Sequence, residues 1–365
     1  DQTNDNVSGG ASDEGFLSKF IRETELDTRL LGMVGALALI WIGFHAYGAI
    51  FNGFGAFLTP RNLWNLSVQT ASIGIMATGM VLVIITRNID LSVGSVLGFC
   101  AIIMGVVQVY ILPEFLGLGH PLIWVIAVLV GITCGAFIGA FHGFLIAYGN
   151  IPAFIVTLGG LLVWRGAAFL VARGETISPV DPTFALMGGG PYGAIGATGS
   201  WIVGALGCAA VIGLILMGRR NRRIFHIQQK PVWAETFLAV VGCGTVIGAV
   251  LLVNAYPWPR GIVRRYAEAE GITIPEGGLF ISHGFAIPVL ILIAVAILMS
   301  ILMSRTRFGR YVYAIGGNPE AASLAGINTQ MMTVKIFALM GALTGLSAVV
   351  ASARLGSATN ALGTL

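Results

Sequence analysis

Three short polar stretches interrupt an otherwise apolar sequence, and the first runs from Arg87 to Ser95. It holds one acid, Asp90, beside the hydroxyl of Ser92. An ionisable group in apolar surroundings is costly unless it pairs, meets water or lines a cavity. Asp90 is therefore predicted to cap the helix that begins at Leu91, by accepting from its free backbone N–H groups. The stretch also suits a hinge beside a transport path, and the two roles are compatible.

The second stretch begins at Asn150 and extends to Arg165, with Pro152, Phe154 and Thr157 between them. Pro152, two residues after Asn150, is typical of the first turn of a helix that Asn150 caps. Arg165 lies deep in an apolar run, so it needs a carboxylate, carbonyl or water partner, or must extend toward the membrane surface. Eight residues of these two stretches are predicted to line a transport path: Asn88, Asp90, Ser92, Ser95, Asn150, Phe154, Thr157 and Arg165.

The third stretch predicts a short helix of about two turns. Asn318 suits the N-cap, Pro319 the first helical position, Glu320 the first turn and Gly326 the position just beyond the end. Such a helix between two apolar runs has two interpretations. It is either an interfacial turn or a rigid projection that a soluble partner binds and so moves the neighbouring helices.

The remaining residues contain no motif that indicates catalysis or metal binding. The five histidines show no metal-ligand spacing, and the four cysteines show no C-x-x-C motif. The sequence contains no H-E-x-x-H, no G-x-S-x-G and no G-x-x-x-x-G-K-[ST] phosphate loop. We therefore expect no catalytic residue, no metal site and no cofactor, and an intramembrane enzyme is disfavoured.

The elements that must position these stretches are membrane helices. The 365 residues are 56% hydrophobic and only 10% charged, whereas a soluble domain carries about 25% charged residues. The 51 glycines suit helices that approach closely within a bilayer. The composition therefore predicts an all-α polytopic membrane protein in contact with a lipid bilayer.

Nine apolar runs approach the length of about 20 residues that a bilayer core requires. The acidic stretch 1–29 is predicted to be a cytoplasmic tail, and residues 30–365 form the transmembrane domain. Polar loops at 173–200 and 255–283 are either plain connections or docking sites for a soluble partner. Between the second and third runs, residues 87–91 form either a tight turn or a broken, re-entrant helix. The nine predicted spans are 31–51, 63–86, 91–112, 122–148, 151–172, 201–217, 232–254, 284–304 and 331–353.

The basic residues set the predicted orientation. Of the 20 Lys and Arg residues, thirteen fall on the side of the N-terminal tail, six fall on the opposite side and Arg165 lies within a span. The dense clusters Arg219 to Arg223 and Arg305 to Arg310 share the first side. The N-terminus is therefore predicted to be cytoplasmic, and residue 365 external. The clusters are short and set between apolar runs, so binding of nucleic acid is not expected.

The third stretch resembles the coupling loop of ABC-importer permeases through the triplet Glu320, Ala321 and Ala322 followed by Gly326. A wider set of motifs resembles the permeases of monosaccharide ABC importers, the ribose, xylose and galactose group, over about residues 60–365. Within that group the xylose permease type is the best match. The motifs are 88–95, Pro152 with 154–158, Arg165 with Gly166, 313–318, 176–179 and an insertion at about 219–256.

This resemblance implies a subunit of about ten helices in the bacterial inner membrane that pairs with a second copy of itself. Residues 318–328 would be the coupling helix that docks on a cytoplasmic ABC ATPase, and a periplasmic sugar-binding protein would bind the opposite face. The cargo would be a monosaccharide, a pentose such as xylose. Members of the group continue past the position of Leu365, so the resemblance implies that this chain lacks the C-terminal segment of the group.

A second hypothesis belongs to a different mechanistic class. An ion-coupled secondary transporter of a small polar solute needs carboxylates within the membrane for H⁺ or Na⁺. Asp90 is the one plausible carboxylate of this kind in the sequence. Uptake that follows an ion gradient without an ATPase partner would favour this second hypothesis.

Overall fold

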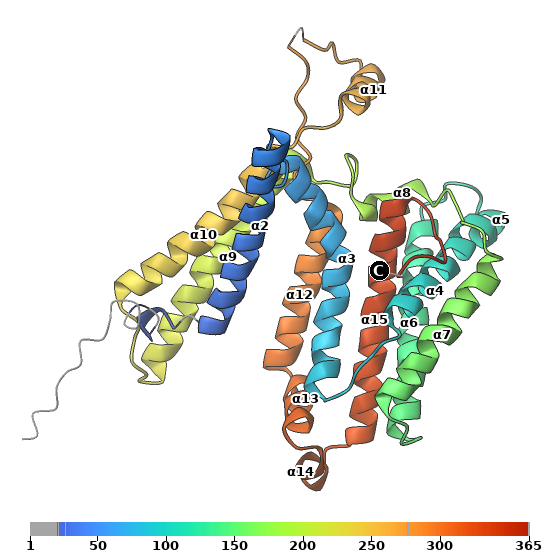
Figure 1. The fold of residues 1–365 in the computed structure, drawn as a ribbon, viewed down its shortest axis with the longest axis vertical. Coiled ribbons are helices and arrows are strands. Elements are labelled where there is room, and N and C mark those ends of the chain that lie inside the picture. The colour runs from blue at the N-terminus through green and yellow to red at the C-terminus, as the bar shows by residue number, and fades with distance from the viewer. Residues whose placement is uncertain (1–19, 21, 26, 276, 364–365) are drawn as a thin grey trace, which may run out of the picture. The chain divides into compact units, whose positions relative to one another are not determined.

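A computed structural model of the chain describes residues 20, 22–25, 27–275 and 277–363. Most of the predicted tail, 1–29, lies outside these residues. The described part is built from helices (Figure 1), and its strand-type pairing is limited to isolated bridges such as that between Ile177 and Ala358. The predicted all-α fold is therefore confirmed for the described part of the chain.

The helices are named in Figure 1 in chain order. Their bounds are α2 Thr28–Asn52, α3 Pro60–Ile85, α4 Val93–Val106, a π-helix Val107–Ile111, α5 Leu112–Leu116, α6 Ile123–Ala147, α7 Ala153–Ala172, α8 Pro182–Ala185, a 3₁₀-helix Leu186–Gly188, α9 Gly196–Ile224, α10 Val232–Asn254, α11 Arg260–Glu270, α12 Ile287–Arg305, α13 Arg307–Gly317, α14 Pro319–Leu324 and α15 Thr329–Leu355.

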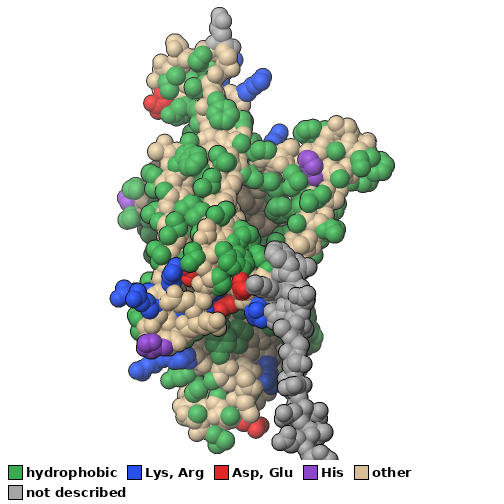
Figure 2. All heavy atoms as spheres, turned by 90° about the vertical axis from the view of Figure 1, so that its left-hand side faces the viewer, with side chains coloured by type: hydrophobic (Ala, Val, Ile, Leu, Met, Phe, Trp, Pro, Cys, Tyr) green, Lys and Arg blue, Asp and Glu red, His purple; other side chains and the backbone are tan. Residues whose placement is uncertain are grey.

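Nine helical segments of the described chain are long and apolar enough to cross a membrane, and each corresponds to a predicted span. The largest difference in bounds is at α9, which runs from Gly196 to Ile224 and so extends beyond the apolar run 201–217 into the basic cluster. On the face that Figure 2 shows, hydrophobic side chains predominate and charged side chains gather in a few limited areas. A bilayer is the solvent that such a surface requires.

The connection between the second and third spans is non-helical from residue 86 to residue 92. In Figure 1 it runs from the lower end of α3 to the start of α4. The third span then consists of α4, the π-helix and α5 in direct succession. The π-helix precedes Pro113, a residue that lacks the backbone N–H of a regular helical turn.

The chain divides into two compact units. The smaller unit comprises residues 1–63 and 198–255, and it contains α2, α10 and most of α9. The larger unit comprises residues 64–197 and 256–365, and it contains the remaining helices.

Within the larger unit, α6 and α15 pack with their backbones in contact. A Cβ atom on Gly139 would meet the carbonyl oxygen of Phe337, and one on Gly341 would meet that of Gly135. Only glycine leaves room for this approach, which is typical of helix pairs in membranes. One apolar cluster then joins this pair to α4 and α7, and a second joins α15 to α3, α12 and α13.

Within the smaller unit the helix contacts are looser. α2 buries none of its residues. α9 and α10 meet where a Cβ on Gly204 would lie 2.6 Å from a methyl carbon of Val250, so the approach is limited by a side chain and not by backbone. Most of the surface of these helices is therefore left for lipid.

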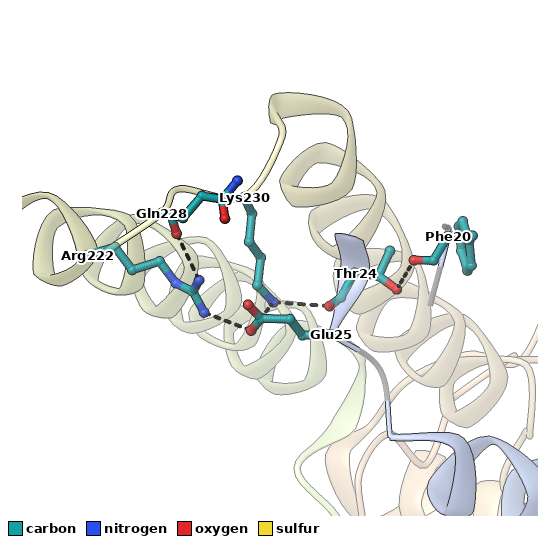
Figure 3. Close-up of polar contacts among 6 residues, drawn as sticks. All are labelled: Phe20, Thr24, Glu25, Arg222, Gln228 and Lys230. Carbon is teal, nitrogen blue, oxygen red and sulfur yellow. Dashed lines mark hydrogen bonds and ion pairs between the residues drawn. The ribbon is translucent and has the colours of Figure 1, made fainter. Parts of the chain in front are cut away.

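One group of polar contacts in the smaller unit lies near the ends of α9 and α10 (Figure 3). The carboxylate of Glu25 lies 2.7 Å from an Arg222 nitrogen and 3.3 Å from the Lys230 nitrogen. The hydrogen bond from Arg222 lowers the pKa of Glu25; partial burial opposes this effect, and Lys230 adds to it. Phe20 packs on Trp233 with ring centroids 5.8 Å apart. We call these contacts the N-terminal clasp.

Candidate functional site

The connection 86–92 is tied to several helices of the larger unit. The guanidinium of Arg87 donates two hydrogen bonds, of 2.7 and 3.0 Å, to carbonyl oxygens of α13. The hydroxyl of Thr157 on α7 donates to the carbonyl oxygen of Ile89 at 3.2 Å. The side-chain amide of Asn88 bonds within the connection, to the carbonyl oxygen of residue 86 at 3.1 Å. The connection is therefore an ordered element.

Asp90 lies at the start of a buried hydrogen-bond chain. Its Oδ1 accepts from the backbone N–H of Ser92 at 2.9 Å and from the Ser92 hydroxyl at 2.6 Å. The hydroxyl oxygen lies 3.4 Å from Nδ1 of His142 on α6, and Trp164 on α7 donates to the other ring nitrogen at 3.0 Å. Because Trp164 can only donate, the proton of a neutral His142 is assigned to Nδ1, which then faces Ser92.

The prediction that Asp90 caps the helix is wrong, because the N-cap of α4 is Ser92 and no side chain bonds the free N–H groups of the helix. α4 begins at Val93, two residues later than predicted, and Asp90 accepts from the N–H of Ser92, which is the N-cap residue. Gly160 of α7 permits this arrangement, because a Cβ there would lie 2.7 Å from the His142 ring. The network therefore joins the start of α4 to α6 and α7.

The predicted cap at Asn150 is wrong. α7 begins at Ala153 after Pro152, and no side chain caps it. Proline favours an extended backbone in the residue before it, so Asn150 lies too far from the first helical N–H groups to bond them. Asn150 instead adopts a left-handed conformation with φ +52° after the end of α6.

The short helix α14 begins as predicted. Oδ1 of Asn318 accepts from the backbone N–H groups of Glu320 at 3.0 Å and Ala321 at 3.1 Å. Pro319 is the first helical residue, where its missing N–H has no cost. Glu320 lies in the first turn, where an acidic side chain is favoured by the helix dipole.

The end of α14 is equally well defined. Gly326 has φ +83°, and its N–H donates to the carbonyl oxygen of Ser323 at 2.9 Å. The N–H of Ile327 returns to the carbonyl oxygen of Ala322 at 3.1 Å, which completes a Schellman motif. Ala322 is buried, whereas Leu324 is 90% exposed. α14 is therefore a rigid turn that presents an apolar side chain outward.

A cleft of about 710 Å³ lies beside α14 in the larger unit, and none of the residues that line it is charged. It brings together parts of all three polar stretches, with Asn88 from the first, Asn150 from the second, and Pro319 and Gly326 from the third. Its polar lining consists of amides and hydroxyls. These residues are Thr86, Asn88, Asn150, Ser323, Asn328, Thr329, Gln330 and Thr333.

The other residues predicted for the path lie elsewhere in the larger unit. Asp90, Ser92 and Thr157 are buried in the connection's contacts, and Ser95 is buried in α4 with no hydrogen-bond partner for its hydroxyl. Phe154 is 51% exposed on α7.

Arg165 does not pair with Asp90. It is exposed and borders a separate hollow of about 410 Å³ with Gly166, Phe169 and Asn360. Exposure removes the need for a buried counter-charge, since a long guanidinium side chain can extend from its helix toward water.

The stretch 255–283 packs its aromatic residues against the start of α3. Trp64 donates to the carbonyl oxygen of Gly284 at 2.8 Å, and the rings of Tyr256 and His283 stack with centroids 4.2 Å apart. Burial lowers the pKa of His283, and its contact with the Tyr256 carbonyl oxygen opposes this effect. The neutral ring is thus favoured, as a stacked histidine in apolar surroundings requires.

Three residues of this region were not singled out by their sequence pattern. They are His142, Trp164 and Gln330, whose amide donates to the carbonyl oxygen of residue 147 at 3.2 Å across the cleft. A polar ring within an apolar span is the one local signal that marks His142. The others acquire their partners only through contacts between helices distant in the sequence.

Comparison with known proteins places these features in a family. Residues 62–216 and 183–364 match the family described as the permease component of branched-chain amino acid transport systems. No solved structure matches the chain.

Several relatives are sugar permeases by name. The xylose transport system permease XylH of Escherichia coli K12 is 33% identical over 85% of this chain and 70% of its own length. XylH of Haemophilus influenzae is 34% identical over 85% of this chain and 72% of its own length. The ribose import permease RbsC of Escherichia coli K12 is 28% identical over 84% of this chain and 66% of its own length. With nine membrane-type helices among the described residues, the chain therefore belongs to this family of transport-system permease components and is a multi-pass membrane transport subunit.

Proposed function

We propose that the chain is the permease subunit of an ATP-binding-cassette importer, which carries a monosaccharide across the bacterial inner membrane. Xylose is the favoured cargo, because the XylH relatives at 33% and 34% identity are xylose permeases. ATP hydrolysis belongs to a partner chain. The permease supplies the path and the surface on which that partner docks.

The observation that carries this proposal is the uncharged cleft beside α14. Amide and hydroxyl groups donate and accept hydrogen bonds as sugar hydroxyls do, and they leave no fixed charge to hold an ion. A sugar that must leave again requires weak contacts of this kind. Asn88, Asn150 and Gln330 are the residues to which we assign these contacts.

α14 is the proposed docking element for the ATPase. Its caps at both ends make it rigid, so a push on its exposed side moves it as one body. Leu324 offers a side chain that can enter a pocket of a soluble partner. α14 joins α13 to α15, so its displacement acts on the helices that border the cleft and supports alternating access.

Other parts of the assembly follow from membership in the family and from the charge distribution. A second copy of the permease completes the membrane part, and a periplasmic sugar-binding protein delivers cargo. The excess of Lys and Arg on one side supports a cytoplasmic N-terminus, which puts α14 in the cytoplasm and the stretches 173–200 and 255–283 in the periplasm.

An ion-coupled transporter is the competing function, and it depends on Asp90. In the structure that carboxylate accepts two short hydrogen bonds from Ser92, and Asp90 is not among the residues that line the cleft. These contacts suit a structural anion better than an ion-binding site that empties in each cycle.

Co-purification with the ATPase tests the proposal. We expect the wild-type chain, co-expressed with the ATPase of its transport system, to retain that ATPase in detergent. Leu324→Asp should abolish retention, because a charge cannot enter an apolar pocket. Leu118→Asp is the matched control, since Leu118 is 91% exposed but lies between α5 and α6. Retention by Leu324→Asp equal to that of the control would contradict the docking role of α14.

A further inference from the structure

Arg87 occupies a position where an arginine is costly. The N–H of Arg87 donates to the carbonyl oxygen of Ile84 at 2.9 Å, and that of Asn88 to Val83 at 3.0 Å. These bonds form a Schellman motif that ends α3, with Arg87 at the left-handed position, φ +61°. Glycine is the usual residue there, and a residue with a Cβ is disfavoured by about 1 kcal/mol. The side chain of Arg87 makes contacts that glycine could not make.

That side chain ends on the junction between α13 and α14. Nε donates to the carbonyl oxygen of Gly316 at 3.0 Å and Nη2 to that of Gly317 at 2.7 Å. These are the last two residues of α13, and Asn318, the cap of α14, follows directly. A cation at the C-terminal carbonyl groups of a helix is favoured by its dipole and by their missing partners.

The same junction is held by direct backbone contact. A Cβ on Gly316 would collide with the carbonyl oxygen of Ile85, in the last turn of α3. The ends of α3 and α13 are thus too close for any residue larger than glycine at position 316. Arg87 locks this contact, so the two helix ends move together.

Beyond Arg87, the chain leads from this junction into the bundle. Asn88 lines the cleft, Ile89 is bonded to Thr157, and Asp90 reaches His142 through Ser92. A short run of ordered residues therefore links the start of α14 to α6 and α7. We define residues 87–92 as the strap.

We propose that Arg87 is a positioning residue that transmits the movement of α14 to the strap and thereby to the cleft. This inference rests on the proposed function, because it assumes that an ATPase moves α14. Removal of the guanidinium leaves α14 and its caps intact but disconnects them from the residues that line the path. Transport is then lost while ATP hydrolysis continues.

The experiment compares Arg87→Gly with Arg173→Gly in proteoliposomes that hold the permease, its ATPase and its sugar-binding protein. Both arginines have a left-handed backbone at a helix end, φ +61° and +52°. Arg173 is exposed, and its side chain makes no hydrogen bond to the described residues. Glycine relieves backbone strain at both positions. The readouts are ATPase retention, ATP hydrolysis and sugar transported per ATP.

We expect Arg87→Gly to retain the ATPase and to lower sugar transported per ATP at least about fivefold, the lower end of ordinary coupling between sites. Arg173→Gly should match the wild type, and Arg87→Lys, which keeps the charge but loses the paired donors, should fall between. An unchanged ratio in Arg87→Gly would overturn the inference, as would loss of ATPase retention. If Arg87→Gly does not fold, the sugar transported per ATP by Arg87→Lys tests the inference: a value below that of the wild type supports it, and an unchanged value overturns it. Failure of the wild type to retain the ATPase would instead count against the proposed function.

Discussion

The two units of the chain use glycine and polar groups in opposite ways. In the larger unit, glycines of α6 and α15 bring two backbones into contact, and a carboxylate, a hydroxyl and two rings form a buried network. In the smaller unit, glycines of α9 meet valine side chains, and the ion pairs lie at helix ends. The larger unit thus has a protein interior, whereas much of the smaller unit is exposed to lipid.

This difference bears on the proposed transport machinery. The strap, the cleft and α14 all belong to the larger unit. Residues that line the proposed polar path need neighbours that keep their side chains in place. The larger unit supplies such neighbours through its close backbone packing. Substitutions of the same kind should therefore have unequal effects in the two units.

The largest difference is expected between Gly139→Leu in the larger unit and Gly244→Leu in the smaller. A side chain on Gly139 collides with backbone of α15, whereas a Cβ on Gly244 meets nothing within 4 Å. We expect Gly139→Leu to cost at least about 3 kcal/mol, the upper range for overpacking, since backbone cannot rotate aside. Yield and thermal unfolding midpoint in detergent measure the effect.

Gly244→Leu serves as the control and should leave both quantities within error of the wild type. Equal loss in the two variants would show that the packing of the two units does not differ in the way described.

A smaller difference is expected between Asp90→Ala and Glu235→Ala. Loss of the Asp90 carboxylate leaves the Ser92 hydroxyl and N–H without their acceptor, at a cost of about 1–3 kcal/mol. Glu235 pairs with Arg219 at 3.0 Å, and their side chains are 12% and 44% exposed. Water reaches this pair through Arg219, so we expect it to contribute only about 1 kcal/mol. Thermal unfolding of both variants tests the order, and a larger loss for Glu235→Ala would contradict it.

The smallest effect concerns the N-terminal clasp. The pKa of Glu25 is lowered in the folded chain, so its ion pairs stabilise the clasp above the ordinary glutamate pKa of 4.5, and this contribution is lost as the pH falls through the lowered value. We expect Glu25→Gln at pH 7 to speed hydrogen exchange of residues 22–25 by less than about fivefold.

The pH dependence supplies the control for that experiment. Below the lowered pKa the wild type and Glu25→Gln should exchange at equal rates after correction for intrinsic exchange. A difference that persists in acid would show that the clasp depends on contacts other than the carboxylate.

Much of the fold follows from local sequence. The nine spans were predictable because hydropathy alone determines which runs enter a bilayer, and α14 because its caps are encoded by Asn318, Pro319 and Gly326. The cap at Asn150 was predicted wrongly, because Pro152 extends the backbone before the helix.

The candidate site was only partly predictable. Asn88 and Asn150 were identified from their types, but the sequence does not place them together in one cleft with Gly326. The roles of Arg87 and His142 depend on partners that are 229 and 50 residues away along the chain. Such pairings arise from helix packing, which no local pattern encodes.

Sugar uptake by reconstituted vesicles tests the central claim most directly. Proteoliposomes holding the permease, its ATPase and its sugar-binding protein are supplied with radiolabelled xylose, with and without ATP, and with and without imposed proton or sodium gradients. We expect uptake that requires ATP and both partners and is unaffected by either gradient. Uptake by the permease alone that follows an ion gradient would contradict the claim and support the ion-coupled mechanism.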